Sequence, residues 1–171
     1  MKKILIAIIT FLCLPIYCLA ADYDIKHFYI DATLKENGDM DVAELIVLDG
    51  TFNGYERDIV YASDYSNYNA SNIENLSISA KYVSSVSFDT FNEVFDTFSE
   101  VDYANNGTMS KYVLTNLGNG LRVRMYYATD NDKTGFLIKY TLKDVGIPHS
   151  DVVEYYWNFI GDLFEDDIRD L

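Results

Sequence analysis

The chain contains 171 residues, of which 27 are acidic and 13 basic, and its formal net charge is −14. A chain this acidic repels nucleic acid and anionic membrane surfaces, which argues against both as partners, and it attracts divalent cations, cationic polymers and basic proteins. Both cysteines, Cys13 and Cys18, lie within residues 1–20. The remainder therefore offers no thiol for a disulfide, a zinc site or a cysteine nucleophile.

Residues 1–20 have the layout of a secretory signal peptide. Two lysines precede an apolar run over residues 4–14, and a proline and a short segment ending at Ala20 follow. The run is shorter than the roughly 20 apolar residues that a membrane-spanning helix needs. We therefore expect an exported protein with one domain over residues 21–171 and no membrane span after cleavage. An uncleaved N-terminal anchor is the alternative.

A β-hairpin is predicted at the start of this domain. Residues 25–34 and 40–48 alternate between apolar and polar side chains, as strands with one buried face do. Asn37-Gly38 between them predicts a two-residue type I′ turn. Asp49-Gly50 and Asn53-Gly54 predict two further corners after the hairpin.

Glu44 interrupts the apolar face of the second strand. A carboxylate in such a position is costly to bury unless it is paired, and Arg57, with its fixed fork of donors, is the candidate partner. The pair could face a ligand, but we favour a buried structural ion pair. Alternatively, the opposite face of the strand, with Ala43, Leu45 and Val47, is the inner one.

Residues 88–101 contain a tandem repeat, FDTFNEV followed by FDTFSEV. The phenylalanines recur at spacings of three and four residues, which predicts a short helical insertion that packs its aromatic face on a sheet. The acidic residues of the repeat would form a stripe beside the aromatic one. A cation-binding or partner-binding site is therefore the alternative interpretation.

Further alternating segments predict strands over residues 73–83, 109–117, 121–128 and 136–142. Between the last two, residues 130–135 (DNDKTG) resemble the opening of a calcium-binding loop, with Asp130 and Asp132 as candidate ligands. That motif also needs a flanking helix on each side and an acid at its twelfth position, where this chain has Thr141. We therefore expect a polar turn between strands, and calcium is the only cofactor that the sequence suggests.

The sequence motifs of the common catalytic sites are missing from this chain. His27 and His149 are the only histidines, and there is no nucleophile elbow, phosphate loop, zinc-binding histidine pair or dinucleotide fingerprint. We therefore predict a non-catalytic protein with no catalytic or cofactor-binding residue. A hydrolase built on paired carboxylates is the remaining enzymatic alternative, because acidic residues are abundant.

A set of motifs spread along the domain carries a family resemblance. In chain order they are Gly38, Glu44, Thr51-Phe52-Asn53-Gly54, Arg57-Asp58-Ile59, residues 136–140, Asp151 and the run from Tyr156-Trp157-Asn158 to Gly161. Their order and spacing resemble the N-terminal extracytoplasmic domain of the YciQ-like family of bacterial membrane proteins of unknown function. The resemblance implies a β-rich domain followed by further strands and transmembrane helices, so we expect this chain to be a shortened form. It implies no activity.

The sequence as a whole predicts an all-β fold, an antiparallel β-sandwich with a short helical insertion. We expect an exported domain of the cell envelope that acts through contacts with a protein or an envelope polymer. The alternative is a calcium- or carbohydrate-dependent surface-binding module, which an aromatic-lined groove would favour. The sequence indicates neither the ligand nor the oligomeric state.

Overall fold

The computed structural model describes residues 21–62 and 69–160, and the predicted signal peptide at residues 1–20 lies outside this part. The described part is nearly all β-strand, with one short 3₁₀ helix. The elements are β1 (Asp22–Leu34), β2 (Met40–Val60), β3 (Asn72–Tyr82), η1 (Phe88–Asn92), β4 (Asp96–Thr97), β5 (Ser99–Glu100), β6 (Met109–Asn116), β7 (Gly120–Lys143), β8 (Ile147–Pro148) and β9 (Val153–Glu154).

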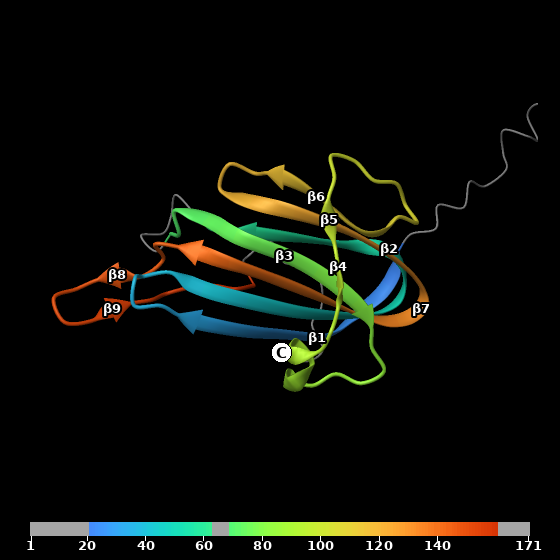
Figure 1. Ribbon diagram of the computed structural model, residues 1–171, viewed down its shortest axis with the longest axis horizontal. Helices are drawn as coiled ribbons and strands as arrows, with labels where there is room; N and C mark the ends of the chain where they lie inside the picture. The colour runs from blue at the N-terminus through green and yellow to red at the C-terminus, as the bar shows by residue number, and fades with distance from the viewer. Residues whose placement is uncertain (1–20, 63–68, 161–171) are drawn as a thin grey trace, which may run out of the picture.

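The long strands β2 and β7 run through both layers of the fold (Figure 1). Residues 40–50 of β2 pair with β1 on one side and with residues 132–142 of β7 on the other, whereas residues 52–60 pair with residues 120–129 of β7. β3 and β4 extend the first layer, and β6 and β5 extend the second. One sheet thus folds onto itself as a sandwich, and it is antiparallel except between β5 and β6. The predicted fold class is confirmed.

Two glycines allow β2 to bend between the layers. Gly50 and Gly54 have φ angles of +145° and +152°, and the register of the sheet shifts between and around them. A Cβ on Gly50 would lie 2.1 Å from the carbonyl oxygen of Asp22, and one on Gly54 would lie 1.9 Å from that of Met125. The Asp-Gly and Asn-Gly pairs are therefore bends inside one continuous strand, where the sequence predicts corners.

The hairpin between β1 and β2 differs from the predicted type I′ turn. The N–H of Gly38 donates to the carbonyl of Lys35 at 3.0 Å, and the N–H of Lys35 donates to the carbonyl of Asp39 at 2.9 Å. Gly38 has a φ of +85°, but Asn37 has no positive φ. This is a three-residue loop with glycine at its left-handed position. The side chain of Asn37 favours this form because its Oδ1 accepts the N–H of Asp39 at 3.2 Å.

The polar turn predicted over residues 130–135 is wrong, because these residues lie inside β7. Asp132 pairs with Gly50 across the strands, and Asn131 has a φ of +58° and donates its N–H to Oγ1 of Thr51 at 3.0 Å. This is where β7 bends from one layer to the other beside the bend of β2. The stretch is polar because Asp130, Asn131 and Asp132 are exposed at that bend.

Only the first copy of the phenylalanine repeat contains a helix, since η1 covers five residues and the second copy is extended. Thr97 in β4 pairs with β3 and Ser99 in β5 pairs with β6, so the second copy links the edges of the two layers. Phe91 of η1 is buried over the outer face of the first layer, whereas Phe98 is buried between the layers. The helical prediction fails after Asn92 because the backbone there pairs with strands, and threonine and aspartate favour helices too weakly to oppose this.

Both faces of the first half of β2 are buried. Val42 and Ile46 belong to the main core between the layers, while Leu45 and Val47 form a second cluster with Phe91 on the outer face. The two alternatives for the inner face of this strand are therefore both partly right. Glu44 shares the face of Val42 and Ile46, so it lies between the layers.

The last described stretch, residues 155–160, packs against the main core beside β1. Tyr155, Trp157, Phe159 and Ile160 are partly buried there. The hydroxyl of Tyr155 donates to the carbonyl of Lys35 at 2.7 Å, which attaches the stretch to the β1–β2 hairpin.

Candidate functional site

The structure brings Glu44 and Arg57 together between the two layers. Because β2 bends at its glycines, its first half carries Glu44 in one layer and its second half carries Arg57 in the other. Nε of Arg57 lies 2.8 Å from Oε2 of Glu44 and Nη2 lies 3.1 Å from Oε1, a bidentate pair. The side chains are 0% and 5% exposed, so solvent reaches neither carboxylate oxygen.

Four more groups complete this cluster. The hydroxyl of Tyr140 donates to Oε1 of Glu44 at 2.7 Å. The guanidinium of Arg57 also donates to the backbone carbonyls of Asp58, at 3.1 Å, and Phe159, at 2.6 Å. It lies over the ring of Phe28, with 5.3 Å between Cζ and the ring centroid.

The carboxylate of Glu44 favours the charged form of Arg57 and the neutral form of Tyr140. Burial opposes the charge of Arg57, but the Glu44 carboxylate outweighs it and the pKa of Arg57 is raised. Burial, together with the negative charge of Glu44, raises the pKa of Tyr140 well above its ordinary value. A carboxylate that is fully buried and already accepts three hydrogen bonds is poorly placed to exchange protons with a substrate. The geometry is that of a structural ion pair.

The candidate calcium ligands, Asp130 and Asp132, lie exposed at the bend of β7. Within residues 21–62 and 69–160, no three acidic, histidine or cysteine side chains gather in a way that could hold a metal ion. The structure therefore does not join the two aspartates to a third ligand.

A ladder of charges covers part of the outer surface of the second layer. Arg122 of β7 pairs with Asp58 of β2 at 2.8 Å, and Arg124 pairs with Glu56 at 3.0 Å. The hydrogen bond from Arg122 lowers the pKa of Asp58. Arg122 and Arg124 are thus both paired with acidic side chains on the adjacent strand.

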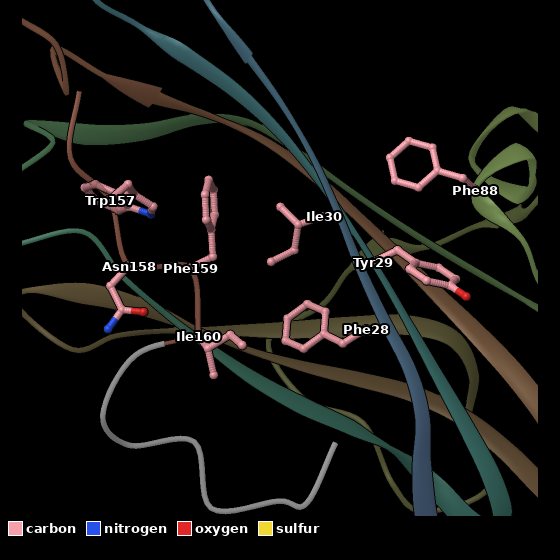
Figure 2. Close-up of a pocket in the computed structure, with 8 residues that line it drawn as sticks. All are labelled: Phe28, Tyr29, Ile30, Phe88, Trp157, Asn158, Phe159 and Ile160. Atoms are coloured by element: carbon pink, nitrogen blue, oxygen red, sulfur yellow. The ribbon is translucent and has the colours of Figure 1, made fainter. Parts of the chain in front are cut away.

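A pocket of about 590 Å³ lies beside β1 (Figure 2). Its walls come from three parts of the chain: Phe28, Tyr29 and Ile30 of β1, Phe88 of η1, and residues 157–160. Figure 2 shows Phe28 and Ile30 on the side of β1 that faces Phe159 and Ile160, and Tyr29 on the side of Phe88. Asn158 is the one residue of this lining without an aromatic or aliphatic side chain.

The ion-pair cluster and the pocket share a wall. Phe28 lines the pocket and lies under the guanidinium of Arg57, and the carbonyl of Phe159 accepts a hydrogen bond from the same guanidinium. Glu44 and Arg57 therefore position the segment that closes one side of the pocket.

Residues 24–171 match the family model described as "Predicted membrane protein (DUF2207) N-terminal domain". The chain belongs to this family. The predicted resemblance to the N-terminal domain of a family of membrane proteins of unknown function is thereby confirmed. No curated protein and no solved structure matches the chain. In the part of this family member that the structure describes, no helix has the length and apolarity required to cross a bilayer.

Sequence reasoning identified the Glu44–Arg57 pair of this family member but missed Tyr140 and the pocket. The alternation over residues 136–142 predicts only that Tyr140 shares a face with its neighbours in the strand, and nothing in its spacing marks a hydrogen bond to Glu44. The pocket was missed because its walls lie far apart in the chain. Two short runs, residues 28–30 and 157–160, supply most of its lining, and neither run alone indicates a pocket.

Proposed function

We propose that this domain is an exported, non-catalytic part of the cell envelope and acts by binding a partner protein at the pocket beside β1. The observation that carries the proposal is the lining of that pocket, which is dominated by aromatic and aliphatic side chains. Aromatic residues are enriched where proteins recognise one another, because they bury a large area with little loss of conformational freedom. Phe88 at the pocket is 55% exposed and its ring lies near that of Tyr29, so the lining includes apolar surface that solvent reaches.

The charged groups support a scaffold rather than a catalyst. Glu44 is enclosed by Arg57 and Tyr140, and Asp39, which is 3% exposed, is hydrogen-bonded to Lys143. Neither carboxylate lines the pocket. The proposal therefore assigns no catalytic role to any of these side chains.

Export is supported by the layout of residues 1–20. It is tested by fusing alkaline phosphatase, an enzyme that needs its disulfides, to the C-terminus of the chain in a bacterial host. We expect an active fusion, and an inactive one when three residues of the apolar run are replaced by aspartate. An inactive fusion of the unaltered chain would contradict export.

Binding is tested by placing a photo-crosslinking amino acid at position 88 in cells that contain the intact envelope. The matched control carries the same amino acid at Val94, which is 90% exposed and does not line the pocket. We expect a discrete crosslinked species from position 88 that polysaccharide-degrading enzymes leave unchanged, and none from position 94. Equal crosslinking from both positions would mean that the pocket is not the binding surface.

A carbohydrate partner is the second candidate, and one observation favours it. The lining contains Trp157 and four other aromatic residues, and aromatic faces also stack on sugar rings. The few polar groups of the lining argue against it, because sugar hydroxyls need several hydrogen-bond partners. The same crosslinking experiment separates the two, since polysaccharide-degrading enzymes convert an adduct with an envelope polysaccharide to a smaller species and leave an adduct with a protein unchanged.

A further inference from the structure

The outer edge of β1 borders the pocket and has no strand beside it in the described part of the chain. β1 pairs with β2 along its length, and no other described strand pairs with it. Its last residues, from Asp31 to Leu34, are exposed, and the side chain of Leu34 is 55% exposed. A strand edge of this kind presents a row of backbone donors and acceptors to solvent.

The second half of this edge has one charged residue, Asp31, and none of the other features that normally prevent strand pairing. Natural edges are blocked by proline, lysine or a bulge. β1 has Lys26 and a bulge between Ile25 and His27, but residues 28–34 (FYIDATL) contain no lysine, proline or glycine and no register shift. These residues are mostly β-branched, aromatic or aliphatic, which suits them to pair with another strand.

Apolar surface lies on both faces of this edge. Ile30 faces the wall formed by Phe159 and Ile160, and Tyr29 points to the other face, where its ring centroid is 6.2 Å from that of Phe88 (Figure 2). The side chains of an added strand would alternate between these two faces. Backbone pairing with pockets for alternate side chains is the usual mode of β-strand addition.

We propose that the edge of β1 over residues 29–34 binds an extended segment of a partner protein as an additional strand. This inference rests on the proposed function and specifies how the partner is held. The segment has apolar residues at alternate positions, which pack on the face of Ile30, Phe159 and Ile160, and polar residues between them on the face of Tyr29.

The negative charge of β1 and of the whole chain favours a partner segment with basic residues. The exposed charges of β1 include Asp22 and Asp31, while Lys26 is paired with Asp24 at 2.8 Å. With a net charge of −14, two copies of the chain repel each other, which disfavours a second copy at this edge. The added strand therefore carries lysine or arginine between or beside its apolar residues.

The test uses synthetic peptides and the fluorescence of Trp157, which is the one tryptophan of the chain and lines the pocket. The first peptide has about eight residues that alternate valine or isoleucine with lysine or threonine. The second has the same composition without alternation, and the third replaces each lysine by glutamate. We expect a saturable change in Trp157 emission with the first peptide and at least about tenfold weaker binding of the other two.

Two proline variants, Ala32→Pro and Thr33→Pro, test the backbone contact. Neighbouring residues of a strand direct their N–H groups to opposite edges, so one variant removes an outward N–H and leaves the pairing with β2 intact. The informative variant is the one that keeps the unfolding temperature of the parent, and Val94→Pro is the control for a surface proline. We expect the informative variant to lose at least about tenfold in affinity for the alternating peptide, and the control to lose none.

The outcomes separate this inference from the proposed function. If the informative variant binds the peptide as the parent does, or if all three peptides bind equally, strand addition is wrong. Crosslinking of a protein at position 88 would still uphold the proposed function in that case. If sedimentation shows that the protein alone forms a dimer that the same proline variant abolishes, a second copy occupies the edge and the partner proposed here is wrong.

Discussion

Arg57 donates a 2.6 Å hydrogen bond to the backbone carbonyl of Phe159, which lies 102 residues later in the chain. The same guanidinium holds the buried carboxylate of Glu44. A structural ion pair in the core thus reaches one wall of the pocket. Changes in the core should therefore alter both stability and the pocket.

Glu44→Gln should destabilise the domain strongly. It leaves the buried charge of Arg57 without its counter-charge, and breaking a buried ion pair from one side costs about 3–5 kcal/mol. Urea unfolding followed by Trp157 fluorescence measures this free energy. The control is the double variant Glu44→Leu, Arg57→Met, which removes both charges and should recover most of the loss. A single-variant loss below about 1 kcal/mol would show that the pair is not a buried structural one.

Tyr140→Phe should have a smaller effect than Glu44→Gln. It removes the hydrogen bond to Oε1 of Glu44 but leaves both hydrogen bonds from Arg57 in place. A hydrogen bond to a charged group contributes about 1.5–3 kcal/mol. The same unfolding measurement applies, and an effect as large as that of Glu44→Gln would mean that Tyr140 does more than donate this bond.

Strand periodicity in the sequence was enough to predict the sandwich, but not how its strands are joined. Asp49-Gly50 is as typical of a turn between strands as of a bend inside one strand, because both use a glycine at positive φ. The structure has a bend there, and the carbonyl oxygen of Asp22 lies close to Gly50. The pairing of Glu44 with Arg57 was predictable because an isolated carboxylate on an apolar face requires a partner. The pocket was not, because residues 28–30, 88 and 157–160 meet only through tertiary packing.

Gly54→Ala should prevent stable folding or cost more than about 3 kcal/mol, because the new Cβ would lie 1.9 Å from the carbonyl oxygen of Met125. Gly107→Ala is the matched control. Gly107 also has a positive φ, of +84°, but nothing lies within 4 Å of its Cβ position, so it should cost only about 1–2 kcal/mol. Thermal unfolding compares the two variants. Equal losses would show that the bend of β2 does not depend on the close approach at Gly54.

Stability should fall in acid through Asp39. The hydrogen bond from Lys143 lowers the pKa of Asp39 to about 2 from its ordinary 3.8. A carboxyl whose pKa is lower in the folded state stabilises the fold above its unfolded pKa, and this contribution is lost as the pH falls from about 4 towards 2. Unfolding temperatures of the parent and of Asp39→Asn across this pH range measure the effect. The parent should fall more steeply than the variant, and parallel curves would contradict the lowered pKa.

We propose that the pocket beside β1 binds a partner protein and that the buried cluster only supports this pocket. The most direct test measures the crosslinking yield from position 88 in cells when Trp157→Ala removes a wall of the pocket. Provided the unfolding temperature is kept, the yield of the protein adduct should fall by at least about tenfold, whereas Val94→Ala should leave it unchanged. An undiminished yield with Trp157→Ala would show that partner binding does not use this pocket.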